Sequence, residues 1–182
     1  MFAPLVQTLS RLMLLRAGPQ DLPSWPLLLQ GACVLYVFST ILRLQLVNPW
    51  FAALAQSGLG LVTLWIYVRA VLRQRGKPER FAQTLSALLL TGGIIGLLMM
   101  PPLQALTPLL LHVAETGDLQ GIEPPVMAAY AWLLLSIWGL VLAGHIFRHA
   151  LETTLGIGIL IALGYEMLLI LVISLLAGLQ GA

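Results

Sequence analysis

Five long stretches of apolar residues alternate with short polar segments along the chain. They cover residues 27–47, 50–72, 81–113, 126–147 and 153–179. At about 1.5 Å of rise per residue, a helix over any of them is long enough to cross a hydrocarbon core of about 30 Å. The pattern therefore predicts an all-α protein, a polytopic transmembrane helical bundle with about five spans.

The third stretch is too long for one straight span, and prolines interrupt it. Pro101 and Pro102 follow directly after Met99 and Met100, and Pro108 comes later. Because proline cannot donate a backbone hydrogen bond, a helix should kink or break there. Either a tilted span continues through the prolines, or residues 82–100 cross alone and residues 103–113 lie at the outer interface. We expect the second arrangement.

The first two apolar stretches are joined by Asn48 and Pro49 alone, so their helices should form a tight hairpin. A re-entrant hairpin would give four spans in all, but 27–47 and 50–72 are each long enough to cross. The region before them, residues 1–26, is a separate segment with a helix and a turn-rich connector. Its apolar residues recur at helical spacing: Leu5, Val6, Leu9, Leu12 and Met13. This amphipathic helix should either lie on the cytoplasmic leaflet or pack against the cytoplasmic ends of the bundle.

Charge sets the expected orientation. The loop after the second span carries five basic residues, which are Arg69, Arg73, Arg75, Lys77 and Arg80. By the positive-inside rule this loop is cytoplasmic, and eight of the nine Lys and Arg residues then fall on that side, the exception being Arg43. The N-terminus would be cytoplasmic and the C-terminus periplasmic, in a bacterial inner membrane. The loop is either a topology signal alone or also a contact for anionic lipid headgroups.

Composition narrows the class of protein. Hydrophobic residues make up 59% of the chain and charged residues 9%, with a net charge of +2. A soluble fold would have too few charged residues to cover its surface, and no basic stripe suggests a nucleic-acid partner. Cys33 is the one cysteine, so an intrachain disulfide is excluded. The N-terminus lacks the order of a cleaved signal peptide, and we expect none.

Two charged residues fall inside the predicted spans. Glu166 lies near the middle of the fifth span, where an ionised carboxylate is costly and a functional role is the default hypothesis. Arg43, nearer the outer end of the first span, is the obvious partner. The two are intramembrane polar candidates, either as a buried pair that fixes helix register or as a proton or cation site.

A second candidate lies at the end of the fourth span. His145, His149 and Glu152 are spaced so that one helix face would carry all three. Two histidines four residues apart can share a weak metal site, although a polar helix end at the membrane surface needs no metal. The sequence lacks the His-Glu-x-x-His pattern, and the helix should turn at Glu152.

Glycine runs inside the spans predict close helix contacts. They include 92–96 in the third span, Gly58 and Gly60 in the second, Gly139 and Gly144 in the fourth, and Gly156, Gly158 and Gly164 in the fifth. The run at 92–96 lies in an apolar helix and follows no strand, so it is no phosphate loop. Walker, nucleophile-elbow and paired-Asp motifs are missing too, so we expect no catalytic residues, no cofactor and no enzyme activity.

The topology resembles that of the Yip1-type five-span membrane protein family, and of its short bacterial relatives in particular. The resemblance covers residues 20–180, with 16–23 and 92–96 as local hints. The family's Asp-Leu-Tyr-Gly-Pro-like signature is not present, so no binding residues carry over.

The expected function is therefore that of a non-enzymatic scaffold or accessory subunit of a membrane assembly. Its partners would be membrane lipids and other membrane proteins or a second copy, and no nucleic acid. The alternative is a small transporter or channel component that uses Glu166 and Arg43.

Overall fold

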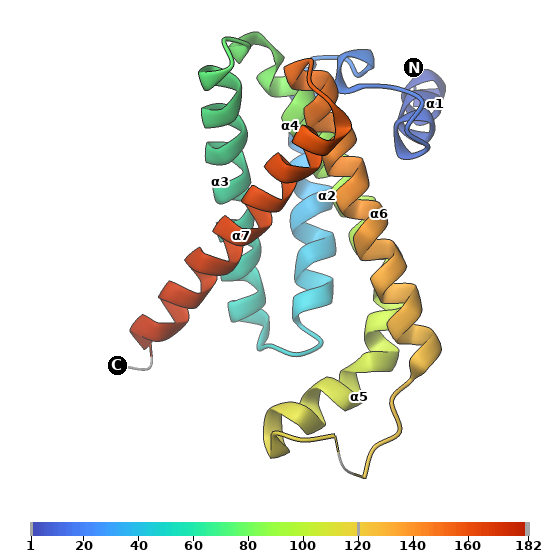
Figure 1. Ribbon diagram of the computed structural model, residues 1–182, viewed down its shortest axis with the longest axis vertical. Helices are drawn as coiled ribbons and strands as arrows, with labels where there is room; N and C mark the ends of the chain where they lie inside the picture. Colours follow the sequence, from blue (N-terminus) through green and yellow to red (C-terminus); the bar gives the residue numbers. More distant parts are fainter. Residues whose placement is uncertain (1, 120, 181–182) are drawn as a thin grey trace.

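The computed structural model describes residues 2–119 and 121–180, and every regular element within them is helical (Figure 1). Seven α-helices follow one another along the chain: α1 (Phe2–Met13), α2 (Pro26–Leu44), α3 (Trp50–Gln74), α4 (Phe81–Leu98), α5 (Met100–Thr116), α6 (Val126–Leu151) and α7 (Leu155–Gln180). Two short 3₁₀ turns, η1 (Pro19–Asp21) and η2 (Pro78–Arg80), precede α2 and α4. The predicted all-α helical bundle is confirmed.

Five segments are long and apolar enough to cross a membrane. They are Pro26–Leu44, Trp50–Gln74, Pro78–Leu98, Val126–Leu151 and Leu155–Leu175. Each overlaps one of the five apolar stretches of the sequence, so the chain is an integral membrane protein.

Helix α4 is the centre of the bundle. Its residues 84–91 are all buried, and α2, α3 and α6 pack around it. Leu85 and Leu89 of α4 join Val68 of α3 and Phe147 of α6 in the main hydrophobic cluster. The other spans keep large apolar side chains on the outside, where a bilayer would cover them.

Glycines of α4 bring α2 close. An added Cβ on Gly93 would lie 2.8 Å from Leu35 Cγ, and one on Gly96 would lie 3.1 Å from Ser39 Oγ. Glycines three residues apart share one helix face, so this face of α4 is flat enough for α2 to approach. The close helix contact predicted from the run 92–96 is present.

Helices α6 and α7 cross at a second glycine contact. A Cβ on Gly158 would clash with the carbonyl oxygen of Gly144, and one on Gly144 would lie 2.9 Å from the backbone nitrogen of Ile159. The packing explanation was wrong for Gly58 and Gly156, because an added Cβ there would meet no atom within 4 Å. Those two glycines face open space.

The helical segment is interrupted after α4, at the prolines. Helix α4 ends at Leu98, and α5 starts at Met100 with Pro101 and Pro102 in its first turn, where a missing backbone donor costs nothing. Helix α5 takes a new direction in Figure 1 and packs mainly against α6. It ends at Thr116, and the following Gly117 caps it with a φ of 77°, the left-handed conformation typical of helix C-termini.

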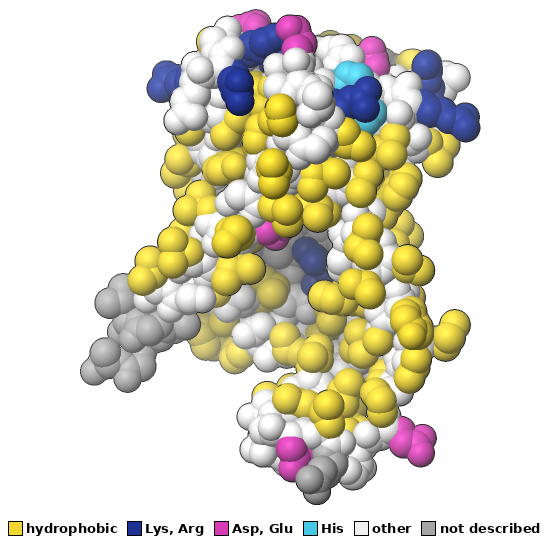
Figure 2. All heavy atoms as spheres, viewed as in Figure 1, with side chains coloured by type: hydrophobic (Ala, Val, Ile, Leu, Met, Phe, Trp, Pro, Cys, Tyr) yellow, Lys and Arg dark blue, Asp and Glu magenta, His cyan; other side chains and the backbone are white. Residues whose placement is uncertain are grey.

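We call the end of the bundle that holds α1, η1, η2 and the α6–α7 turn the basic end. Dark blue side chains gather there in Figure 2, and the opposite end shows acidic ones. Helix α1 buries Leu12 completely, and its Leu5 and Leu9 pack against the main cluster, while Val6 is exposed. These residues of α1 therefore contact the bundle, while a position on the cytoplasmic leaflet stays a prediction.

Candidate functional site

Arg43 lies in the last turn of α2, against the glycine face of α4. A Cβ on Gly96 would be 3.2 Å from Arg43 Nε, so the missing side chain at Gly96 leaves the room that the guanidinium occupies. Arg43 Nη2 is 3.5 Å from Thr40 Oγ1, which makes a weak hydrogen bond, and Nε is buried without a partner. A buried N–H that donates to nothing is costly and rare.

Glu166 lies opposite, on α7. It is the twelfth of the 26 residues of that helix, about 17 Å from its start and so near the middle of a hydrocarbon core of about 30 Å. Its side chain is exposed, yet many protein atoms lie around it. Both conditions hold for a side chain in a recess, which is open on one side.

Arg43 and Glu166 interact electrostatically, but no ion pair within 4 Å joins them among the described residues. In Figure 1, α7 crosses the bundle at an angle, and its C-terminal half leans away from α6. Figure 2 shows this face hollowed between the two helices, with one basic and one acidic side chain at the hollow. The sequence suggested Arg43, nearer the outer end of its span, as the partner of Glu166, and in the structure the two side chains interact electrostatically without direct contact.

Three tyrosines connect helices of the bundle, and two of them, Tyr36 and Tyr165, interact electrostatically with Glu166. Tyr165 donates a hydrogen bond to the carbonyl of Gly60 at 3.3 Å, and its hydroxyl lies 3.5 Å from that of Tyr36. Tyr67 donates to the carbonyl of Ile161 at 2.8 Å. The hydroxyls therefore link α2, α3 and α7. Sequence reasoning missed them, although tyrosines in mid-span, away from the headgroup level, were a usable signal.

The recess thus combines a guanidinium, a carboxylate and phenol hydroxyls within an apolar bundle. Charged groups at this depth are costly unless they are paired or hydrated, and Arg43 and Glu166 are not in contact with each other. A solute with one acidic and one basic group could accept hydrogen bonds from Arg43 and donate them to Glu166. The arrangement is therefore suited to binding a small polar or zwitterionic solute, or to moving a proton.

At the basic end, Arg80 holds the last turn of α6. Its Nη1 donates to the carbonyls of His149 and Ala150 at 3.1 Å each, and its Nη2 donates to the carboxylate of Glu152. Lys77 pairs with the same carboxylate. A cation at these free carbonyls stabilises a helix C-terminus. The hydrogen bonds from Lys77 and Arg80 hold the pKa of Glu152 below its usual value.

The five basic residues expected to contact lipid headgroups therefore have different surroundings. Lys77 and Arg80 are engaged with Glu152, and the guanidinium of Arg69 lies 5.1 Å from the centre of the Trp65 ring. Arg73 and Arg75 are exposed. Headgroup contact stays a prediction for this loop, and two of its members already stabilise the end of α6.

The histidine pair lies where the sequence placed it, with ring centres 4.5 Å apart. His145 is buried, and its Nε2 donates to the carbonyl of Ala17 at 2.9 Å, because a carbonyl can only accept. Glu152 is the left-handed C-cap of α6 and binds Lys77 and Arg80. Over 2–119 and 121–180, no group of three or more His, Cys, Asp or Glu side chains is arranged to hold a metal ion.

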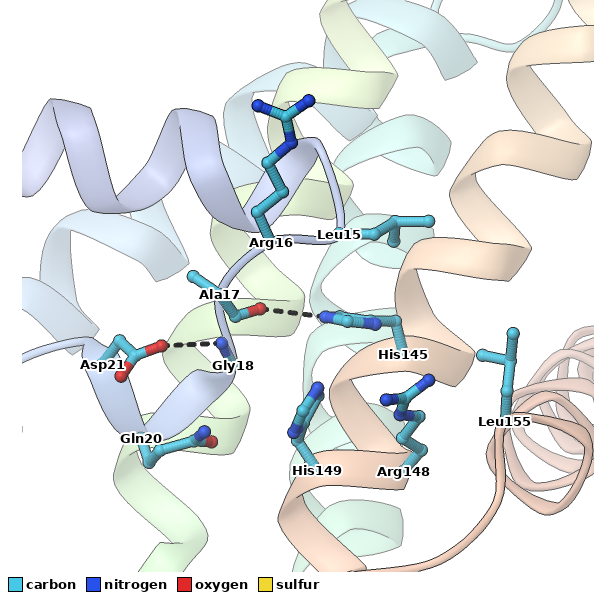
Figure 3. A pocket seen from close by; sticks show the side chains of 10 residues that line it. All are labelled: Leu15, Arg16, Ala17, Gly18, Gln20, Asp21, His145, Arg148, His149 and Leu155. Atoms are coloured by element: carbon cyan, nitrogen blue, oxygen red, sulfur yellow. Dashed lines mark hydrogen bonds between the residues drawn. The ribbon is translucent and has the colours of Figure 1, made fainter.

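A pocket of about 390 Å³ opens beside these histidines. Its wall is formed by the connector between α1 and η1 on one side and by the last turns of α6 on the other (Figure 3). This pocket could not be predicted from the sequence, because the connector and α6 are more than 120 residues apart in the chain.

Comparison with protein families, with curated proteins and with solved structures found no match. The Yip1-type resemblance stays a prediction, and the functional argument depends on the geometry above.

Proposed function

We propose that the protein is a small transporter or channel component that binds a polar or zwitterionic solute in the recess between α6 and α7. Arg43 and Glu166 would supply the charged contacts. In the proposed orientation the basic end faces the cytoplasm of a bacterium and the recess opens within the inner membrane, since the positive-inside rule places Lys and Arg on the cytoplasmic side.

One observation carries this proposal: two opposite charges face the same recess without forming an ion pair. A pair that only fixed helix register would be in contact, because at this depth direct contact is what offsets the cost of desolvation. Leaving Arg43 Nε buried and unpartnered costs stability, and proteins retain such costs at binding sites.

Access to water tests the proposal directly. In a Cys33→Ala background, Glu166→Cys would be treated with charged, membrane-impermeant methanethiosulfonate reagents. The matched control is Met167→Cys, the next residue on α7, whose side chain is 71% exposed on the outside of the bundle. A thiol must ionise to react, which needs water. We expect Glu166→Cys to react and Met167→Cys to stay unmodified, because lipid would cover position 167.

Arg43 gives the same experiment a second readout. When Arg43→Gln is added to Glu166→Cys, the ratio of the reaction rate of the anionic reagent to that of the cationic reagent should fall. The guanidinium that attracts the anionic reagent is then lost. If neither Glu166→Cys nor Met167→Cys reacts, the recess contains no water, and a solute site there is refuted. A loss of about 3–5 kcal/mol in Glu166→Gln would also contradict it, since that is the effect of breaking a buried structural pair.

The scaffold or accessory-subunit role is the second proposal, and one observation favours it. The C-terminal half of α7 leans away from the bundle and exposes Met167, Ile170, Leu171 and Leu175. A helix of a partner protein or of a second copy could pack there. Crosslinking of cysteines at these positions within native membranes, together with a dry recess, would favour this role over transport.

A further inference from the structure

The pocket at the basic end is built from two segments held together by specific hydrogen bonds. His145 of α6 donates to the carbonyl of Ala17, and the amide of Gly18 donates to Asp21 Oδ2 at 2.8 Å. The first bond fixes the connector to α6 and the second closes the turn within the connector and η1, and Figure 3 shows both of them at the edge of the pocket. At about 390 Å³ the pocket is within the range of about 300–1,000 Å³ that is usual for small-molecule sites.

The side chains around the pocket carry an excess of positive charge. Arg148 and His149 come from α6, and in Figure 3 both point toward the ring of His145. Arg16 comes from the connector, and in Figure 3 its exposed guanidinium points away from the histidines. Neither Arg16 nor Arg148 has an ion-pair partner within 4 Å in the described part of the chain. Asp21 is the one acidic residue of the lining, and one of its oxygens already accepts from Gly18.

We propose that this pocket binds a phosphate group. Guanidinium groups bind phosphate oxygens through two parallel hydrogen bonds, and His149 would add a third donor. Leu15 and Leu155 give the lining an apolar part beside the cationic one. Such a combination suits the headgroup of an anionic phospholipid or a small soluble phosphate ester. This site is separate from the recess of the proposed function and does not depend on it.

The test uses the purified full-length chain in a neutral detergent. Binding of short-chain phosphatidylglycerol and of inorganic phosphate would be measured separately by native mass spectrometry and by calorimetry. We expect Arg148→Gln and Arg16→Gln each to weaken binding about tenfold, the typical effect of losing one charge-assisted hydrogen bond. Arg16 is exposed on the connector, so its variant should fold even if Arg148→Gln does not.

Arg73→Gln is the matched control, because Arg73 is an exposed arginine near the same end and is outside the pocket. Its binding should be unchanged. Binding of the lipid alone would identify a headgroup site, and binding of inorganic phosphate as well would identify a site for soluble phosphate. The proposal would be overturned if neither probe binds. It would also be overturned if Arg73→Gln and Arg16→Gln lose the same binding affinity, since that result indicates surface charge alone.

Discussion

Replacing Gly158 with alanine tests whether the α6–α7 crossing stabilises the bundle. The new Cβ would clash with the carbonyl oxygen of Gly144 and lie 3.0 Å from the backbone nitrogen of Arg148. Both atoms are backbone, so no side chain can rotate away and the two helices must separate. Such overpacking costs about 1–3 kcal/mol, whereas alanine in place of glycine in a helix gains up to about 1 kcal/mol. The expected net loss is about 1–2 kcal/mol.

The free energy of unfolding would be measured by titrating mixed micelles with dodecyl sulfate and following the far-ultraviolet circular dichroism. Gly58→Ala is the matched control, because Gly58 is in the interior of α3 and its Cβ would meet no atom within 4 Å. That variant should be as stable as the parent or more stable by up to about 1 kcal/mol. Equal stabilities for Gly158→Ala and Gly58→Ala would refute the close crossing.

Three further predictions follow from contacts at the basic end and among the tyrosines. Glu152→Gln should lower the free energy of unfolding at neutral pH, because the pKa of Glu152 is depressed in the folded protein. Its contribution is therefore present above the unfolded pKa of about 4.3 and disappears as the pH falls through the folded pKa. The stabilities of parent and variant should converge as the pH is lowered from 7 to 3, and also in high salt. Tyr67→Phe removes the 2.8 Å hydrogen bond to the carbonyl of Ile161 and should cost about 0.5–1.5 kcal/mol in the same micelle assay, with no change expected at the exposed Tyr130→Phe. In a Cys33→Ala background, Arg75→Cys should react with an impermeant reagent only after the cells are opened, and labelling of intact cells would reverse the proposed orientation.

The elements that depend on local pattern could be predicted from the sequence. The apolar stretches located the five candidate spans, and Pro101 and Pro102 located the break after α4, because hydrophobic length and a missing backbone donor act on the segment that contains them. The charged pair of the recess was found for the same reason, since Glu166 and Arg43 stand out from their own helices.

Contacts between distant parts of the chain could not be predicted. Arg80 was assigned to a basic loop, yet it binds carbonyls 69 and 70 residues away at the end of α6. His145 was considered as a metal ligand, while its Nε2 fixes the connector at Ala17. Such partners depend on how the helices pack, and the spacing of residues within one helix contains no information on that. The glycines show the same limit, since Gly158 and Gly156 are two residues apart and only one is in contact.

The order of the helices also affects how the protein enters the bilayer. Arg43 is on α2, whereas the glycine that leaves room for it is on α4 and the opposing carboxylate is on α7. When spans are inserted one after another from the N-terminus, Arg43 therefore reaches lipid before either neighbour has been synthesised. Its position in the last turn of α2 lets the long side chain extend to the headgroups during that interval. Because Gly96 of α4 makes the room for the guanidinium, packing of α2 against α4 is what encloses this charge.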